Sequence, residues 1–237
     1  MKRPVNMLIP LSILFSVALL SGRCRMEKEG SRASDPSQQA RIKLPPPLYK
    51  SQTSIEEALL QRRSIRNYKK EQLELRDISQ ILWAGQGITS ENGGRTAPSA
   101  GAIYPLELYV LSGDIKDVPP GVYHYLPAEH SLDLVARGDL RNALSGAASM
   151  QGSVRRGAAV VVITANYQRI TRKYKERGVR FAHLEAGHAA QNICLQAVSL
   201  GIGTVTVGAF TDSEVTQLLH LPPNEEPLYL MPLGKRK

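Results

Sequence analysis

Residues 179–200 read VRFAHLEAGHAAQNICLQAVSL, and we interpret the rest of the chain around this stretch. It contains no proline, and it is followed by Gly201, a residue that commonly ends a helix in a left-handed conformation. One stripe at helical spacing is apolar and mostly small, and the other is polar with almost no charge after Glu185. A surface helix usually carries charged residues on its outer face. We therefore predict one long helix covered on both sides, either inside the domain or at a subunit interface.

The composition fits one globular domain with additional sequence in front of it. The chain has 237 residues, of which 42% are hydrophobic and 22% are charged. Its formal net charge is +9, and much of the excess lies in short clusters, which favours either a solvated surface or an anionic ligand. Nucleic acid is disfavoured as a partner, because only 5% of the residues are aromatic and no binding motif is recognised. Cys24 and Cys194 make no disulfide framework.

The N-terminal 50 residues predict an export segment and a linker. Met1–Leu20 combines a basic start with a short apolar run, as in a signal peptide. Residues 20–24 resemble a lipoprotein box, although Arg23 stands where a small residue is expected. We expect residues 1–23 to be a signal peptide or membrane anchor, with lipidation at Cys24 as an alternative. Residues 24–50 are polar and then proline-rich, as in a linker. The expected location is the periplasm or cell envelope.

Residues 51–237 have the pattern of an α+β domain. Ser54 and Glu57 form a capping box for a first helix. Helices and strands then mix without strict alternation, which argues against a doubly wound parallel sheet. Further helices are predicted at 75–84, 139–148, about 166–176, 179–200 and 212–219. Strands are predicted at 106–112, 122–126, 132–136, 158–165, 204–207 and 228–233.

Several common sites are disfavoured by their spacing. Gly201 and Gly203 follow a helix rather than a strand, so they do not form a dinucleotide-binding loop. His183 and His188 are five residues apart, which places them on different faces of a helix. Glu185 and His188 share a face, but a di-metal bundle needs a second such pair. We expect no metal site.

Five segments together carry a family resemblance. They are RRSIR at 62–66, APSAGAIYPLE at 97–107, EAGHAAQN at 185–192, the glycines of 201–208, and PLGK at 232–235. In this order they resemble the nitroreductase-like FMN flavoproteins, and most nearly the SagB/ThcOx-type dehydrogenase branch that includes azoline oxidases. The resemblance covers about residues 44–237. It implies a nitroreductase-like fold, with a mixed, mainly antiparallel sheet flanked by helices around a central buried helix. It also implies a homodimer with FMN at the subunit interface.

The resemblance assigns residues to the cofactor, and their chemistry suits FMN. Guanidinium groups bind a phosphate through paired hydrogen bonds, and small residues let a backbone approach a flat ring. The alternatives are a solvated helix end for the arginines and ordinary turns for the glycines. The expected phosphate-binding residues are Arg62, Arg63, Ser64 and Arg66, with Lys235 or Arg236. The expected ring-binding residues are Pro98, Ser99, Ala100, Gly101, Val207 and Gly208.

Lys173 and Tyr174 resemble the Lys-Tyr pair with which azoline oxidases remove a proton, so they are the candidate catalytic residues. The alternative for them is an exposed basic helix that contains a tyrosine. Ala102 and Tyr104 stand where classical nitroreductases have other residues, so one cofactor contact of that branch is missing. His188 is expected to be a hydrogen-bonded interior histidine.

These features predict an FMN-dependent oxidoreductase. It would pass hydride from NAD(P)H through flavin N5 to an electron-poor acceptor of nitro or quinone type, in a ping-pong sequence. One alternative is an azoline-type dehydrogenase of a peptide or small molecule, with oxygen as acceptor. The other is an exported flavin-binding protein without enzymatic activity. Contact with a membrane is expected only through the N-terminal segment.

Overall fold

The computed structural model describes residues 41–237, which belong to one compact unit. The expected signal segment, Cys24 and the linker as far as residue 40 lie outside the described residues. Strand β1 (Arg41–Lys43) pairs with a strand of the main sheet, and Leu44 is buried. The folded domain therefore includes the last part of the expected linker, and the boundary at residue 51 is placed too late. Within 41–237, no helix is both long and apolar enough to cross a membrane.

The domain is built on a seven-stranded sheet in the order β1-β4-β3-β2-β5-β7-β6. Every pair of neighbouring strands in it is antiparallel. The expected α+β class with a mainly antiparallel sheet is confirmed. The remaining strands are β2 (Leu106–Ser112), β3 (Gly121–Leu126), β4 (Ser131–Arg137), β5 (Ala159–Asn166), β6 (Ile202–Thr204) and β7 (Glu225–Lys235).

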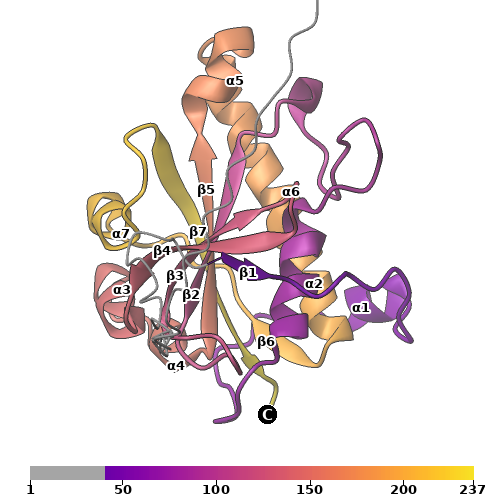
Figure 1. Ribbon diagram of the computed structural model, residues 1–237, viewed down its shortest axis with the longest axis vertical. Coiled ribbons are helices and arrows are strands. Elements are labelled where there is room, and N and C mark those ends of the chain that lie inside the picture. The colour runs from indigo at the N-terminus through magenta and orange to yellow at the C-terminus, as the bar shows by residue number, and fades with distance from the viewer. Residues whose placement is uncertain (1–40) are drawn as a thin grey trace, which may run out of the picture. The chain divides into compact units, whose positions relative to one another are not determined.

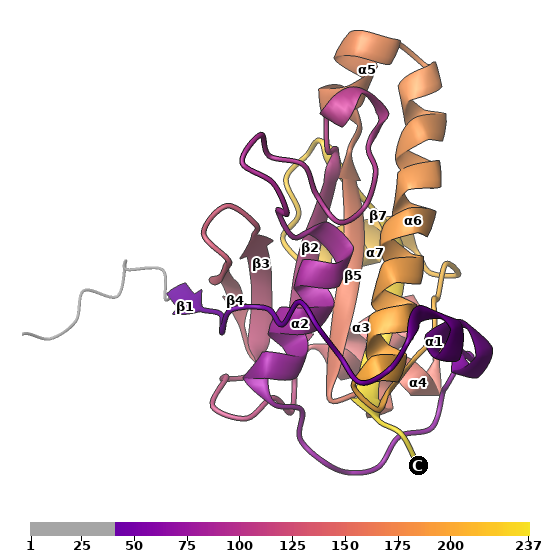
Figure 2. The same cartoon turned by 90° about the vertical axis from the view of Figure 1, so that its right-hand side faces the viewer.

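Helices cover both faces of this sheet (Figures 1 and 2). In the central strand β5, Val161 and Ile163 join the core under α2 and α6, whereas Val160 and Val162 join the core under α3, α4 and α7. This alternation follows from the two-residue period of a strand. The near-continuous apolar sequence of β5 thus reflects burial on both faces, as predicted. The helices are α1 (Ile55–Gln61), α2 (Leu75–Gln86), α3 (Arg141–Ala147), α4 (Gly152–Arg156), α5 (Tyr167–Tyr174), α6 (Arg177–Ser199) and α7 (Asp212–Leu218).

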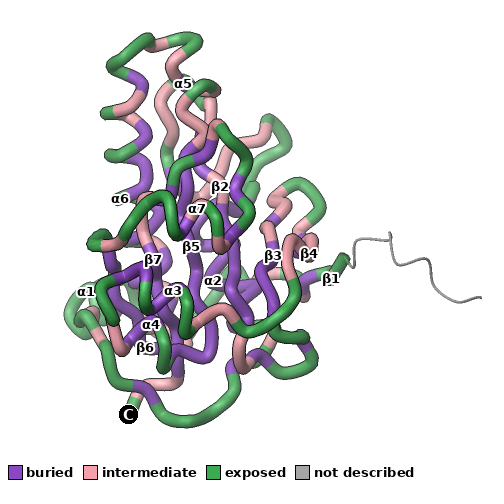
Figure 3. The backbone as a smooth tube through the Cα atoms, turned by 90° about the vertical axis from the view of Figure 1, so that its left-hand side faces the viewer, coloured by how far each residue is buried: buried purple, intermediate pink, exposed green. Residues whose placement is uncertain are grey.

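The long helix predicted at 179–200 is present as α6, and Gly201 follows it with a φ of +65°. One face of α6 is buried and consists largely of alanine, which lets the helix lie close to the sheet. The other face is not covered in a single chain. Leu184, Gly187, His188 and Gln191 are exposed, and Figure 3 shows buried and exposed segments alternating along the helix. The helix was predicted to be covered on both sides, and within a single chain only the face that packs on the core is covered.

Three elements differ from the prediction. The short helix α4 and strand β1 carry too few residues to show a periodic pattern, and both were missed. The strand expected at 204–207 lies instead at 202–204. It is β6, and it pairs with the C-terminal end of β7. Val207 forms only an isolated bridge to Leu230.

Replacing Ile193 with Ala should test the packing of α6. The Ile193 side chain is fully buried and lies within 3.1–3.3 Å of the Cβ position that a residue larger than glycine would have at 85. The cavity left by the Ala variant should lower the free energy of unfolding by about 2–5 kcal/mol, and Ile193→Val by about 0.5–1.5 kcal/mol. Urea unfolding measures both. Equal losses for the two variants would show that Ile193 is not tightly packed.

Candidate functional site

Two small pockets lie along the exposed face of α6, and each contains residues predicted for the site. The Arg62 pocket has a volume of about 200 Å³ and is lined by Arg62, Ser64, Gly187, Ala190, Gln191, Cys194, Thr204, Val205, Thr206 and Tyr229. The Ser99 pocket has a volume of about 280 Å³ and is lined by Pro98, Ser99, Ala100, Phe181, Leu184, Glu185 and His188. The N-terminal half of α6 contributes to the Ser99 pocket, and the following two turns contribute to the Arg62 pocket.

A pair of facing glycines holds the 62–68 segment beside the Arg62 pocket. Gly203 of β6 is the register partner of Gly234 of β7. A Cβ atom at Gly203 would come within 2.6 Å of Ile65, and one at Gly234 would come within 2.6 Å of Tyr68. The Ile65 N–H also donates to the Thr204 carbonyl at 2.8 Å. These glycines therefore form neither a turn nor a contact to a flat ring. Their lack of side chains lets the segment that carries Arg62 and Ser64 pack directly against the two strands.

The Arg62 pocket is suited to an anion. Arg62 follows the last residue of α1 and is half-buried. Among the described residues it makes no ion pair, so no carboxylate of residues 41–237 neutralises its charge. The hydroxyl-bearing residues Ser64, Thr204 and Thr206 line the same pocket, and the buried Thr204 Oγ1 finds no hydrogen-bond partner within residues 41–237. A guanidinium with nearby hydroxyl donors is a common arrangement for binding phosphate.

The other residues predicted for the phosphate are not brought into this pocket. The Arg63 guanidinium donates to the carbonyl groups of Leu60 and Arg62, and Arg66 is exposed outside the lining. The Lys235 ammonium donates to Asp77 at 2.7 Å, so in this chain its charge is paired with a carboxylate, and Lys235 lies outside the pocket lining. Arg236 is half-buried and also lies outside the lining.

Val207 and Gly208 form the segment expected at the edge of the flavin ring. They differ in whether their backbone is free to contact a ligand. Val207 is buried, and its N–H donates to the Leu230 carbonyl at 2.9 Å. Its backbone donor is therefore used within the fold. Gly208 is exposed and follows this bridge directly. Of the two, Gly208 is the residue whose backbone can meet a ligand.

The 98–101 loop forms one wall of the Ser99 pocket, and its backbone is strained. Gly101 has a φ of +61°, and Ala102 and Tyr104 have φ values of +53° and +51°. Left-handed conformations at residues other than glycine are costly and tend to occur at functional sites. The Ser99 hydroxyl oxygen accepts a hydrogen bond from the Tyr104 N–H at 2.8 Å, which fixes the turn before β2.

Lys173 and Tyr174 reach this loop, although they are about 70 residues away in the chain. A Cβ atom at Gly101 would come within 2.6 Å of both the Lys173 Nζ and the Tyr174 Oη. Lys173 is exposed, Tyr174 is half-buried, and the Tyr174 ring packs edge-on against Phe181 of the pocket lining. The predicted catalytic pair is therefore next to the predicted ring-binding loop, and a side chain at 101 would displace the ends of Lys173 and Tyr174 and strain a backbone at φ +61°.

Glu185 is a buried carboxyl group in the lining of the Ser99 pocket. Its exposed fraction is 2%, and neither carboxyl oxygen has a partner at hydrogen-bonding geometry among the described residues. Burial raises its pKa to about 7, and the nearby Ser99 hydroxyl and Arg95 guanidinium offset only part of that rise. His188, expected in the interior, is instead exposed and lines the same pocket.

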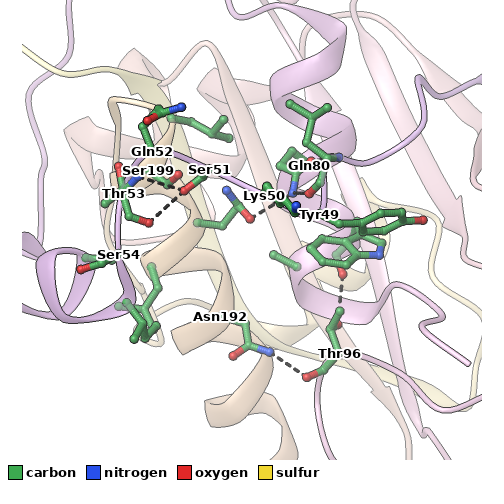
Figure 4. A pocket seen from close by; sticks show the side chains of 18 residues that line it. Tyr49, Lys50, Ser51, Gln52, Thr53, Ser54, Gln80, Thr96, Asn192 and Ser199 are labelled. Carbon is green, nitrogen blue, oxygen red and sulfur yellow. Dashed lines mark hydrogen bonds between the residues drawn. The ribbon is translucent and has the colours of Figure 1, made fainter.

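A larger cavity, of about 650 Å³, lies beside these two pockets between the segment before α1, helix α2 and the C-terminal part of α6 (Figure 4). Its walls are stabilised by hydrogen bonds from Gln80 to Leu48 and to Gln196, and from Asn192 to Thr96. Lys50 is the one charged residue in its lining. It therefore offers neither an anion-binding cluster nor an acid–base pair. Among residues 41–237, no group of three or more His, Cys, Asp or Glu side chains is arranged to hold a metal ion.

Sequence reasoning did not assign Thr204, Thr206, Gln191 or Tyr229 to the site, because a single hydroxyl or amide carries no motif. Glu185 was named as a dismissed metal ligand and as the first residue of the family segment 185–192, but no role in the site was assigned to it. One signal in the sequence could have identified it. Glu185 is an acidic residue among the alanines on the side of the helix that is otherwise buried.

Comparison with known proteins gives consistent matches. The sequence profile of the nitroreductase family matches residues 59–235. MJ1384 of Methanocaldococcus jannaschii, named as a candidate nitroreductase, is 46% identical over 182 residues, which cover 77% of this chain and 91% of that protein. A candidate nitroreductase of Ralstonia eutropha has a solved structure that superposes with a TM-score of 0.72 at 30% identity, covering 83% of this chain and 90% of that one.

A third relative belongs to peptide maturation. The microcin B17-processing protein McbC of Escherichia coli is 33% identical over 162 residues, which cover 64% of this chain and 58% of that protein. These matches confirm the resemblance drawn from the five sequence segments, including its direction toward the SagB/ThcOx-type branch.

Replacing Glu185 with Gln should flatten the pH dependence of stability. A carboxyl group whose pKa rises on folding from 4.5 to about 7 stabilises the fold below its unfolded pKa, and this contribution is lost as the pH rises through about 7. At about 1.36 kcal/mol per pKa unit, the wild type should lose roughly 3 kcal/mol more than the variant between about pH 4.5 and about pH 8.

Urea unfolding over this pH range measures the difference between the two proteins. Glu226→Gln, which removes an exposed carboxyl group, is the matched control. Equal pH dependence in the wild type and Glu185→Gln would contradict the burial of a protonated Glu185.

Proposed function

Because the chain belongs to the nitroreductase family of oxidoreductases, we propose that it binds FMN and transfers hydride from NAD(P)H to an electron-poor acceptor. The observation that carries this proposal is the unpaired Arg62 among the hydroxyl groups of Ser64, Thr204 and Thr206. FMN ends in a phosphate, which such a pocket can bind. When bound, the flavin supplies the hydride chemistry, and the residues of this chain bind and orient it and the substrate.

We further propose that the active form is a homodimer and that each cofactor site is built from two copies of the chain. In one chain, the Arg62 pocket and the 98–101 loop line separate pockets along α6. The exposed α6 face between them carries Leu184, Gly187 and Gln191, with little charge to oppose burial. A second copy packed on this face would bring its own 98–101 loop against the first copy's Arg62 pocket. It would also cover the polar stripe that the single chain leaves open.

Within such a site, each group has a distinct task. Arg62 and Ser64 hold the phosphate, and the exposed Gly208 offers a backbone close to the ring. The 98–101 loop lies against the other side of the ring, where its small residues avoid steric conflict. Phe181 and Leu184 add apolar surface to the Ser99 pocket, which limits the access of water to the reacting atoms.

A second candidate function is a dehydrogenase of azoline type. The observation that favours it is the position of Lys173 and Tyr174 at Gly101. The Lys173 ammonium also lies 5.4 Å from the centre of the Tyr174 ring. A dehydrogenase must remove a proton from a substrate C–H or N–H group as hydride leaves, and this pair could accept it. The similarity to McbC, which processes a peptide, agrees with this alternative.

Export remains a proposal for the N-terminal segment. It rests on the Lys2-Arg3 start and the short apolar run up to Leu20. In that case, the domain would work in the periplasm or cell envelope.

The cofactor proposal predicts that the purified domain is yellow, and that Arg62→Ala weakens FMN binding by about 1.5–3 kcal/mol, the usual range for a hydrogen bond to a charged group. Arg63→Ala is the matched control, because the Arg63 guanidinium donates to the backbone rather than lining the pocket. It should change the affinity by less than about threefold, that is, by less than a neutral hydrogen bond is worth. Fluorescence titration with FMN measures both. Colourless protein that cannot be reconstituted with FMN would refute the assignment, and bound flavin that NAD(P)H fails to reduce would favour a flavin carrier.

Lys173→Ala and Tyr174→Phe separate the two candidate reactions. A reductase does not need a base to remove a proton from its acceptor, so both variants should keep nitro or quinone reduction within about tenfold of wild type. General-base catalysis is worth roughly 10²–10⁴-fold, and a dehydrogenase would lose that amount. The measurement is the steady-state rate with FMN occupancy checked by absorbance. A loss of more than about a hundredfold with FMN still bound would reject the reductase in favour of the dehydrogenase.

A further inference from the structure

We propose that the carboxyl group of Glu185 is the proton donor for an acceptor that binds in the Ser99 pocket. The inference rests on the proposed function, since the hydride and its electron pair come from the reduced flavin. The inference adds the source of the proton that the acceptor must receive together with the hydride.

The surroundings of Glu185 leave its carboxyl group without a structural partner. Its buried neighbours on α6 are Ala182, Ala186 and Ala189, whose side chains offer no hydrogen-bond donor, whereas His188, which shares its face of the helix, is exposed. Among residues 41–237, neither oxygen has a partner at hydrogen-bonding geometry, although the Ser99 hydroxyl lies near enough to act on the carboxyl group, and the residue lines the pocket. A buried polar group that lacks a partner usually has a functional reason or a missing ligand. An acceptor that fills the pocket would supply the missing partner.

The charged and polar groups around Glu185 are few. From the loop, Ser99 and Arg95 act on it. The Arg95 guanidinium donates to Gln86 at 2.9 Å and lies over the Tyr104 ring, so it does not form an ion pair with Glu185. His188 lines the pocket one turn along the helix, and Lys173 and Tyr174 of α5 lie at Gly101 of the loop. No cation is therefore positioned to keep Glu185 permanently ionised.

A second buried glutamate shows what a structural role looks like in this fold. Glu225 is also buried, but its carboxylate accepts hydrogen bonds from the Tyr109 hydroxyl at 2.9 Å and the Thr164 hydroxyl at 3.1 Å. Burial raises the pKa of Glu225 as well. Glu225 is thus satisfied and lies away from both pockets, which makes it a matched control for Glu185.

The chemistry of Glu185 suits reversible proton transfer at neutral pH. Because burial raises its pKa to about 7, the group holds a proton in a large share of molecules and can also release it. During acceptor reduction, the carboxyl O–H bond breaks as a new O–H or N–H bond forms on the acceptor. The hydride brings both electrons. The resulting carboxylate then recovers a proton from water when the product leaves.

The first test measures the step in which a quinone reoxidises the pre-reduced protein by stopped flow over about pH 5.5 to pH 9. In the wild type the rate should fall as the pH rises through about 7. Glu185→Gln should be slower by roughly 10²-fold or more and should lose this pH dependence. Glu225→Gln should keep the wild-type profile. A Glu185→Gln rate within about threefold of wild type, with the bend near pH 7 retained, would overturn the proposal while leaving FMN binding intact.

The second test does not depend on the cofactor or on activity. Infrared spectroscopy of the flavin-free protein should show a protonated carboxyl band that disappears as the pH rises through about 7. The band should be absent in Glu185→Gln, and its midpoint should move upward in Ser99→Ala, because the Ser99 hydroxyl stabilises the carboxylate. If no such band titrates in the wild type, the proposal is wrong, even where the Gln variant fails to fold. Failure of FMN to bind would refute the proposed function instead, and this titration would not be affected.

Discussion

Helix α6 lies close to the sheet, and this approach determines both the packing of the core and the position of Glu185. The buried face of the helix is largely alanine, so little side-chain volume separates its backbone from β5 and β2. Glu185 lies in that face, where among residues 41–237 neither carboxyl oxygen has a partner at hydrogen-bonding geometry and the nearby Ser99 hydroxyl offsets only part of the effect of burial. The same packing that stabilises the core therefore creates a dehydrated acid beside the 98–101 loop, and the raised pKa of Glu185 follows from it.

The other face of α6 explains why the site is divided. Residues from its N-terminal half belong to the Ser99 pocket, and residues from the next two turns belong to the Arg62 pocket. The facing glycines 203 and 234 fix the Arg62 segment on the sheet edge, and Gly101 fixes Lys173 and Tyr174 at the loop. Each half is rigidly built, and a second copy lying on the exposed face would join one half to the other. Dimer formation and cofactor binding would then depend on the same surface.

The sequence predicted those features that follow from periodicity and from motifs. The helix at 179–200, the doubly buried β5 and the capping of α1 by Ser54 each have a strong local pattern, and each is present. The sequence missed what depends on distant partners. Lys235 belongs to a segment expected to bind phosphate, but its ammonium group donates a hydrogen bond to Asp77, which is 158 residues away in the chain. Helix α4 and strand β1 are too short to show a period, and the lack of partners around Glu185 becomes visible only once its neighbours on the loop are known.

In the proposed homodimer, each cofactor site combines the Arg62 pocket of one copy with the 98–101 loop of the other. A complementation experiment tests it directly, using Arg62→Ala and Gly101→Leu chains, each of which should bind FMN poorly alone. Leu at 101 would collide with Lys173 and Tyr174 and would strain a backbone at φ +61°. In a mixed dimer, one site would carry both changes and the other neither. Co-refolding the two variants should therefore restore wild-type FMN affinity at one site in each mixed dimer. If mixing restores no binding although mixed dimers form, each site is contained within a single chain and the account is wrong.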